Sequence, residues 1–447
     1  MPISIIRKIH GTAVIAASLR NQKLIPYWPK RRLEEIRDRR IRDMVQYAAR
    51  VVPYYRDMFA RERIDPRDIK TATDLDRLPI VSRETVRANP SGFLSEANDS
   101  RGALSFKTSG STGTPSEISH DRRSLLANVA FGERERDPIV RHCRSFRPKE
   151  LYVGYETSTF KKVIKFYNDS VLMPVRPHRT FVHLQEPIET VAATLNKERP
   201  EILVGYGGWI DLFFRSIAAL RIEIHPPKLV LYMGEALPHG ARSFIEQNYG
   251  IPVWSRYNAV EAFKIGYYCE QQSGFHIHED LCRLRIVDPG GRDVQPGVQG
   301  EIVISNLINK ATVLLNYSIG DLAAAVESDC PCGRSFKRIS ELEGRVEDVL
   351  PLSDGRFIHP RSIWEVFKRD PELLQYQIVQ QDWNRFELVL VTVDAESYQR
   401  VLARILPGLK SLLGREPVIR AEFRSGSNRI PGMKFRAVVS KIKHTGA

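Results

Sequence analysis

The spacing of hydrophobic and polar positions predicts strands that alternate with helices in the middle of the chain. Residues 150–155, 201–204 and 228–232 are short, mainly apolar runs of strand character. Stretches with helical spacing, at 190–197 and 209–219, separate these runs. Because strands that alternate with helices assemble into a covered sheet, this region predicts an α/β fold.

The flanking regions follow other patterns. Residues 31–63 combine arginine, glutamate and aliphatic positions at helical spacing, with a break at Pro53, and therefore predict a helical cap. Beyond the α/β region the character changes toward β structure. Short strands are expected there at 283–287, 300–305 and 312–317, separated by turns rich in proline and glycine.

The last part of the chain has the pattern of a separate module. Strands are expected at 377–380 and 386–393, together with helices at 360–368 and 398–413. An α+β module of about a hundred residues has a common domain size. We therefore expect two domains, which are a large α/β domain of residues 1–345 and a small α+β domain of residues 346–447.

Composition adds a class of partner. The chain has 67 Lys and Arg against 53 Asp and Glu, so its surface should attract anions such as nucleotides, CoA-like cofactors, an acidic carrier protein or a membrane face. Nucleic acid is not expected, because no long basic run is interleaved with aromatic residues. The five cysteines are few and odd in number for 447 residues, which predicts a reducing compartment and hence a cytoplasmic protein.

An apolar run from Gly11 to Leu19 follows the basic residues Arg7 and Lys8. It is too short to span a bilayer, so no membrane span is expected. An amphipathic helix packed on the body of the protein is the favoured interpretation, and the basic flanks leave a membrane-surface helix as the alternative.

A glycine loop with many hydroxyl groups is the most informative local motif. The sequence T-S-G-S-T-G-T-P at Thr108 to Pro115 lies between two runs short enough to be the strands of a hairpin. Glycines let a backbone approach an anion closely, so the loop favours phosphate binding, although an ordinary polar turn has the same composition. A P-loop NTPase is excluded because no lysine follows the second glycine.

With the motifs that follow it, the chain resembles the adenylate-forming (ANL) enzymes, in the branch of phenylacetate–CoA ligase, CapK and coenzyme F390 synthetase. The resemblance runs from Pro53 through Lys434. It rests on six motifs in the family's order, which are T-S-G-S-T-G-T-P at Thr108 to Pro115, G-E-A-L-P at Gly234 to Pro238, Y-N-A-V-E at Tyr257 to Glu261, Y-S-I-G-D at Tyr317 to Asp321, C-P-C-G-R at Cys330 to Arg334 and G-R-V-E-D at Gly344 to Asp348.

The resemblance implies a site for ATP and Mg²⁺. Tyr257 would face the adenine, Glu261 would hold Mg²⁺ against the phosphates, and Asp321 would accept the ribose hydroxyls. Each has a plainer interpretation, as a core tyrosine, a surface glutamate and a turn-capping aspartate. The nucleotide-binding residues that it implies are Thr108, Ser109, Gly110, Ser111, Thr112, Gly113, Thr114, Gly234, Glu235, Ala236, Tyr257, Asn258, Asp321 and Arg345.

Lys434 is the expected catalytic residue, together with Glu261. It lies in a glycine-containing turn near the C-terminus, where the family has its adenylation lysine. Its ammonium group would neutralise charge as a carboxylate attacks the α-phosphorus and pyrophosphate leaves. In the family the small C-terminal domain rotates between this step and acyl transfer.

Cys269, His276, Cys330 and Cys332 would together supply three thiolates and an imidazole, a closed set that suits structural Zn²⁺. Their spacing is not that of a standard zinc finger, so the residues alone leave metal and reduced core thiols open. Branch members with these residues bind zinc, which favours the metal. His278 is the competing imidazole, and Cys282 is interpreted as a core residue.

The activity that the resemblance implies is ATP-dependent activation of a carboxylic acid to an acyl-adenylate, with transfer to CoA. An amine, a carrier protein or another cofactor stays open as the acceptor, as in amide-forming ligases or adenylyltransferases, and so does a homodimer. A non-catalytic nucleotide- or glycan-binding protein is the rival. Tyr206, Trp209, Tyr232 and Met233 are expected near the acyl group, which suggests an apolar or aromatic acid, although core positions explain them equally well.

The chain departs from the family's pattern at three places. Glu347 stands where the hinge residue is often aspartate, Asn258-Ala259-Val260 replaces a spacer of small residues, and Met433 separates Gly432 from Lys434. The first keeps a carboxylate. The other two put the shape of the pocket and the placement of the lysine in doubt.

Overall fold

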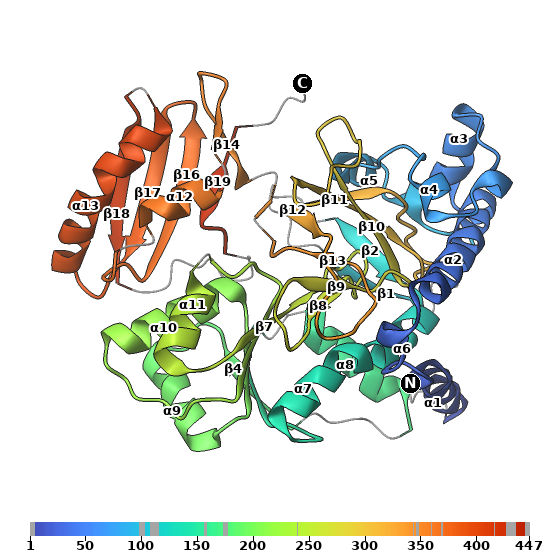
Figure 1. Ribbon diagram of the computed structural model, residues 1–447, viewed down its shortest axis with the longest axis horizontal. Coiled ribbons are helices and arrows are strands. Elements are labelled where there is room, and N and C mark those ends of the chain that lie inside the picture. Colours follow the sequence, from blue (N-terminus) through green and yellow to red (C-terminus); the bar gives the residue numbers. More distant parts are fainter. Residues whose placement is uncertain are drawn as a thin grey trace. The chain divides into compact units, whose positions relative to one another are not determined.

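A computed structural model describes residues 5–97, 103–107, 116–155, 159–172, 178–238, 240–342, 344–345, 348–358, 360–367, 370–414, 416–425 and 435–442. The chain divides into two compact units (Figure 1). Unit 1 consists of Met1–Arg147, Glu156–Pro177 and Ser255–Glu341, and unit 2 consists of Pro148–Tyr155, His178–Trp254 and Leu342–Ala447. The predicted domain boundary after residue 345 lies beside the last of these divisions and stays a prediction.

Unit 1 opens with the expected helical cap. Pro53 stands at the first position of a helix, where its missing N–H costs nothing, and it separates two helices where the sequence predicted a break. The helices of this unit are α1 (Ile5–Leu19), α2 (Lys30–Val51), α3 (Pro53–Arg61), α4 (Ala72–Leu75), α5 (Arg83–Ala88), α6 (Arg122–Phe131), α7 (Glu133–Cys143) and α8 (Thr159–Ser170). Short 3₁₀ turns are η1 (Ile25–Tyr27), η2 (Pro66–Asp68) and η3 (Ser91–Phe93).

The strands of unit 1 form an antiparallel sheet and a separate hairpin. The sheet has the order β10-β11-β12-β13-β9-β8-β7. Its members are β7 (Val253–Tyr257, of which the last three residues fall in this unit), β8 (Gly266–Tyr268), β9 (Phe275–Ile277), β10 (Cys282–Val287), β11 (Gln299–Asn306), β12 (Tyr317–Val326) and β13 (Arg338–Ile339). The hairpin pairs β1 (Leu104–Lys107) with β2 (Glu117–His120).

The strand predicted at 312–317 is wrong in its position. Apart from an isolated bridge at Thr312, regular pairing begins only at Tyr317. The residues before it are buried, but their backbone groups bond to several different segments, such as Thr312 N–H to the Ser119 carbonyl and Val313 N–H to the Phe93 carbonyl. Apolar residues that are buried without ladder pairing produce the same sequence pattern as a strand.

Unit 2 contains the expected α/β layer. A parallel sheet of order β6-β5-β3-β4 carries a core that includes Leu203, Trp209 and Phe213. The elements are β3 (Glu150–Gly154), β4 (Arg179–His183), β5 (Ile202–Gly205), β6 (Leu229–Met233), α9 (Ile188–Glu198), α10 (Gly207–Ala219) and α11 (Ala241–Tyr249). This part follows the predicted alternation closely.

A second sheet in unit 2 has the order β18-β17-β16-β19 and its own core, which includes Ile378, Leu388 and Val401. Its outer pairs are parallel and its central pair is antiparallel. The elements are β14 (Leu350–Pro351), β15 (Phe357–Ile358), α12 (Pro360–Phe367), β16 (Gln375–Asp382), β17 (Arg385–Val391), α13 (Ala395–Leu413), β18 (Val418–Arg424) and β19 (Val438–Ser440). The mixed α/β fold class predicted from the sequence is confirmed, and no described helix is long and apolar enough to cross a membrane.

Candidate functional site

The hairpin of β1 and β2 brackets the predicted phosphate loop. The strands pair from Leu104 with His120 to Lys107 with Glu117, so they close on the loop between them. Phe106 and Ile118 are buried opposite each other, and the Ser105 and Ser119 hydroxyls are hydrogen-bonded at 2.7 Å. The loop residues themselves, Thr108, Ser109, Gly110, Ser111, Thr112, Gly113 and Thr114, lie outside the described residues.

Two predicted nucleotide-binding residues meet in unit 1. Tyr257 ends β7, Asp321 lies in β12, and both are buried. The Tyr257 hydroxyl donates to Asp321 Oδ2 at 2.7 Å. The sequence separates these residues by 64 positions, so their contact comes from the antiparallel sheet and not from local spacing. A buried tyrosine that is hydrogen-bonded to a carboxylate also fits a structural role, so the adenine and ribose contacts stay predictions.

Glu261 follows Tyr257 on the same connection and is buried, with 7% of its surface exposed. The expectation of a solvated surface glutamate, its plain interpretation, is therefore excluded. The backbone around it is held from two sides, since Asn306 Nδ2 donates to the Glu261 carbonyl at 2.9 Å and His120 Nε2 lies 2.6 Å from the Val260 carbonyl. A buried carboxylate on a fixed backbone suits a cation ligand. Asn258 lies beside it, on the same connection.

His120 is a residue that the sequence reasoning missed. It ends β2, so its bond to Val260 joins the hairpin to the segment that carries Glu261. A carbonyl only accepts, so Nε2 carries the proton. Burial lowers the pKa of His120 to about 4, which keeps the ring neutral near pH 7. The available signal was its place at the end of the second strand beside the loop, in I-S-H-D.

A buried carboxylate, Glu135 of α7, anchors the same part of unit 1. It contacts Lys264 Nζ at 2.6 Å, Arg256 Nε at 3.3 Å and His278 Nε2 at 3.2 Å. Burial alone would raise the pKa of Glu135, but these cationic partners and hydrogen bonds outweigh it and hold the value at about 2. The network therefore fixes the strands on both sides of Glu261.

Replacing Glu135 with glutamine should destabilise the protein, because Lys264 and Arg256 would keep buried charge without a counter-ion. We expect a loss of about 3 kcal/mol in the free energy of unfolding. Urea unfolding at pH 7 measures it. Because the pKa of Glu135 is lowered on folding, its contribution is present above about pH 4 and is lost as the pH falls toward 2. The difference between the wild type and the variant should shrink over that range, and a constant difference would contradict the assignment.

The G-E-A-L-P loop follows β6 in unit 2. Gly234 has φ +80°, a conformation that favours glycine, and the Tyr206 ring lies where a Cβ would project. Gly207 packs so closely on this loop that a Cβ there would lie 2.3 Å from the Ala236 carbonyl oxygen. Glu235 Oε1 accepts the backbone N–H of Phe435 at 2.9 Å. The predicted Glu235 is thus bonded to the residue that follows Lys434, while Lys434 itself lies outside the described residues.

Arg345 is held through its backbone, whose N–H donates to Asp348 Oδ2 at 3.2 Å. Asp348 also pairs with the Arg436 side chain. This aspartate therefore links the predicted hinge with the segment that precedes β19, and the sequence reasoning assigned it no such role. A contact of the Arg345 side chain with ribose or phosphate stays a prediction.

Two of the four residues expected near the acyl group are core residues. Trp209 and Tyr232 are 1% and 4% exposed and belong to the core of the parallel sheet. The sequence pattern could not distinguish them from pocket residues, because both kinds of position are aromatic. Tyr206 and Met233 are half-buried. Tyr206 lies in a group of three rings. The centroid of the Tyr155 ring is 6.2 Å from that of Tyr206 and 5.8 Å from that of His183.

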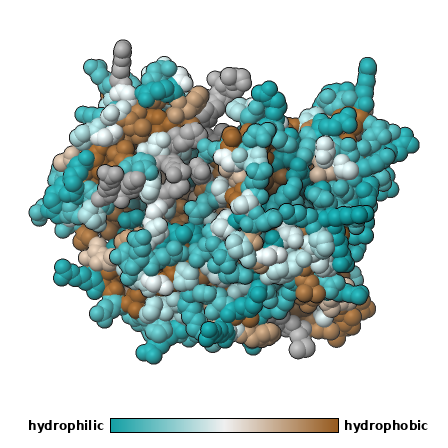
Figure 2. Space-filling view, in the orientation of Figure 1, coloured by the Kyte–Doolittle hydropathy of each residue, from teal (hydrophilic) through white to brown (hydrophobic). Residues whose placement is uncertain are grey.

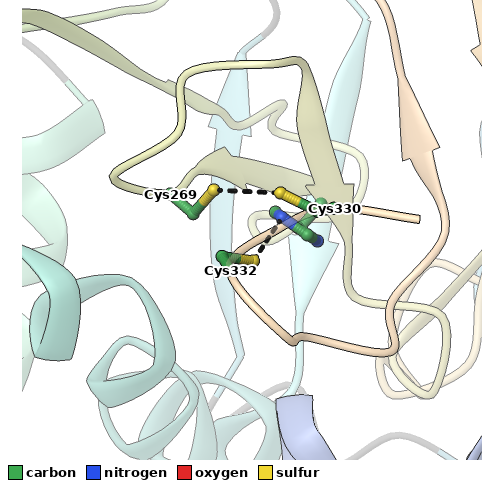
Figure 3. Close-up of side chains that lie close together, drawn as sticks. Cys269, Cys330 and Cys332 are labelled. Carbon is green, nitrogen blue, oxygen red and sulfur yellow. Dashed lines mark hydrogen bonds between the residues drawn. The ribbon is translucent and has the colours of Figure 1, made fainter. Parts of the chain in front are cut away.

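The four predicted metal ligands come together in unit 1. One ligand atom from each of Cys269, His276, Cys330 and Cys332 lies within 4.8 Å of the others. Figure 3 shows the three thiols gathered from two segments that are distant in sequence, with Cys269 Sγ 3.7 Å from Cys330 Sγ. Cys332 Sγ lies 3.4 Å from His276 Nε2.

These distances fit a tetrahedral ion. With Zn–S bonds of about 2.3 Å, two thiolates on a tetrahedron lie about 3.8 Å apart, and a thiolate and an imidazole nitrogen slightly closer. His278, the competing imidazole, contacts Glu135 instead, and Cys282 is fully buried elsewhere with its pKa raised to about 12 by burial. The residues present therefore fit a structural zinc site, with no open position for catalysis.

No protein-family model matches the chain. Among solved structures, 2-hydroxyisobutyryl-CoA ligase in the postadenylation state with R3-HIB-AMP is similar, with a TM-score of 0.74 and 18% sequence identity over 94% of this chain and 91% of that chain. The same ligase in complex with 2-HIB-AMP and CoA gives a TM-score of 0.59 over the same shares. The fold is that of the adenylate-forming ligases.

Curated relatives resemble the chain over about three quarters of its length. The phenylacetate-coenzyme A ligase of Thermus thermophilus is 24% identical over 366 residues, which are 78% of this chain and 79% of the relative. The Aromatoleum evansii ligase of the same name is 22% identical and covers 77% of each chain. The predicted resemblance to the adenylate-forming superfamily, in its phenylacetate–CoA ligase-like branch, is confirmed.

Proposed function

We propose that this protein is a ligase that activates a carboxylic acid with ATP to an acyl-adenylate and then transfers the acyl group to CoA. The observation that carries the proposal is the contact of Tyr257 with Asp321, on a connection that also carries the buried Glu261. The relatives are named as CoA ligases, and the similar ligase binds acyl-AMP and CoA, which supports the same two half-reactions here.

Each residue has a role in the first half-reaction. Tyr257 presents a flat face to the adenine, and Asp321, whose carboxylate already accepts one hydroxyl, accepts those of the ribose. The glycine loop at residues 108–115 encloses the phosphates with its N–H and hydroxyl groups. Glu261 would hold Mg²⁺, and the ion would supply charge neutralisation for the departing pyrophosphate. Lys434 stabilises the negative charge that develops on the α-phosphoryl group.

The acid is proposed to be apolar or aromatic. Tyr155, His183 and Tyr206 form a cluster of rings in unit 2 beside Gly234 of the G-E-A-L-P loop. Such rings bind an apolar group and exclude water. An assay of acid-dependent ATP–pyrophosphate exchange over a panel of aryl, branched and linear acids tests this. If no acid of the panel supports exchange, the proposed function is contradicted. If only short polar acids support exchange, the proposed class of acid is wrong but the function stands.

CoA is the proposed acceptor, and an amine, a carrier protein or another cofactor is the alternative. The enzyme should be given the best acid of the panel with ATP and with CoA, amines or neither, while AMP release and product mass are recorded. A thioester that forms only with CoA supports the ligase. An amide formed at equal rate without CoA would instead support an amide-forming ligase, and nucleotide binding without pyrophosphate release would favour a non-catalytic binding protein.

We also propose that Cys269, His276, Cys330 and Cys332 hold a structural zinc ion. Replacing Cys330 and Cys332 with serine should reduce the zinc content from about one ion per chain to near zero, because two of four ligands are lost. Elemental analysis of the purified protein measures this. Cys282→Ser is the matched control, since that buried thiol lies outside the cluster, and it should retain the metal. A wild type that contains no zinc, and whose melting temperature is the same with and without the metal, would rule the site out.

A further inference from the structure

Helix α1 is attached to unit 1 by one of its faces. A Cβ at Gly11 would lie 2.0 Å from the Ser170 carbonyl oxygen, so glycine is required where α1 crosses the end of α8. Arg122 of α6 donates to the Arg7 carbonyl at 3.0 Å, and the Leu172 N–H donates to Thr12 Oγ1 at 3.1 Å. The expected packing of this helix on the protein body is therefore confirmed.

The opposite face of α1 is apolar and turned outward. Ile5, Ile6 and Ile9 are 67%, 74% and 51% exposed. At 100° per residue, they fall with the exposed Ala13, Ala16 and Ala17 within an arc of about 120°. Figure 2 shows hydrophobic surface over this helix, at the lower right. Leu19 and Leu172, which are 43% and 47% exposed, add further apolar surface at the C-terminal ends of α1 and α8.

Positive charge accompanies this apolar face. At 100° per residue, Lys8 and Arg7 lie about 60° and 80° beyond the two ends of the arc, and Arg20 follows the last turn of the helix. Helix α1 contains no acidic residue. Of the nearby acids, Asp121 caps α6 through the Ser124 N–H, and Asp169 in the last turn of α8 is half-buried. The face thus combines exposed isoleucines with cationic edges.

We infer that the outer face of α1 is a binding surface for the headgroup region of an anionic lipid bilayer. The bilayer buries the isoleucines and neutralises the flanking cations in one contact. A second copy of the chain would fit less well, because α1 has no acidic residue to pair with the Arg7 and Lys8 of the other copy. The helix is too short to span the hydrocarbon core, so it lies along the surface.

Sedimentation of the full chain with vesicles tests the inference. Vesicles of phosphatidylcholine with about 30% phosphatidylserine are compared with pure phosphatidylcholine at about 0.1 M salt, where electrostatic attraction is only partly screened. The triple variant I5S/I6S/I9S should bind the anionic vesicles at least about tenfold more weakly than the wild type. The variant R7Q/K8Q should lose about fivefold for each cation removed.

V298S/V418S is the matched control, because both valines are exposed but lie on other elements of the fold. It should bind like the wild type, and all variants should keep the wild-type melting temperature. A wild type that stays in solution with anionic vesicles would overturn the inference, as would equal binding of the triple variant or of neutral vesicles. Light scattering that finds a wild-type dimer, converted to a monomer by I5S/I6S/I9S, would reassign the face to self-association.

Discussion

Lys434→Ala should reduce acid-dependent ATP–pyrophosphate exchange by about 1,000-fold or more, since a preorganised cation at a developing negative charge contributes a factor of this order. The lysine acts on the α-phosphoryl group only during adenylation. Transfer to CoA from a supplied acyl-adenylate should therefore keep most of its rate. The Phe435 N–H bond to Glu235 ties the segment next to this lysine to the G-E-A-L-P loop, which favours this residue over the other lysines of the chain.

The control for Lys434 is Lys441→Ala. Lys441 directly follows β19, and its backbone N–H donates to the Gln380 carbonyl. No role is proposed for its side chain. Exchange by the Lys441 variant should equal that of the wild type. Equal loss of exchange and of acyl transfer in the Lys434 variant would refute its assignment to the first half-reaction.

Glu261→Gln should lower the rate of adenylation by about 100-fold to 1,000-fold and raise the Mg²⁺ concentration needed for half-maximal exchange. Glutamine keeps the shape and the burial of the side chain, so the change removes one negative charge from the proposed cation site. A neutral amide binds Mg²⁺ far more weakly than a carboxylate. Titration of exchange activity with Mg²⁺ at saturating ATP separates this effect from a loss of ATP affinity.

Glu117→Gln is a suitable comparison for Glu261, because Glu117 is an exposed residue of β2 beside the glycine loop. This substitution also removes one negative charge, but from a residue that is not a proposed Mg²⁺ ligand. We expect its Mg²⁺ titration to match the wild type. If Glu261→Gln slows exchange but leaves the Mg²⁺ titration unchanged, the carboxylate has another role, such as holding the connection after Tyr257.

The fold class and the hairpin around the glycine loop were predictable because each depends on local spacing. The grouping of His276 with the three cysteines was predictable only with the family resemblance, since nothing local distinguishes His276 from His278. The structure separates them, because His278 is bonded to Glu135 of α7. Similarly, Glu135 and Asp348 act through partners distant in sequence, and a single sequence does not reveal such partners.

One error arose where burial and secondary structure give the same pattern. The apolar residues from Thr312 are buried without regular pairing, so they were predicted as a strand. Trp209 and Tyr232 are aromatic because they fill the core under the parallel sheet, and the sequence could not place them there or at the acyl group. In contrast, the contact between Tyr257 and Asp321 depends on the order of the strands in the sheet, which local sequence patterns do not reveal.

The close approach of Gly207 to the Ala236 carbonyl limits how this enzyme can be redesigned for other acids. Any side chain at position 207 would displace the backbone of the G-E-A-L-P loop, so libraries that vary this position will mostly yield misfolded variants. Tyr206, its neighbour, is half-buried and packs on Gly234 through its ring. A search for altered selectivity should therefore begin by trimming that tyrosine and leave the adjacent glycine untouched.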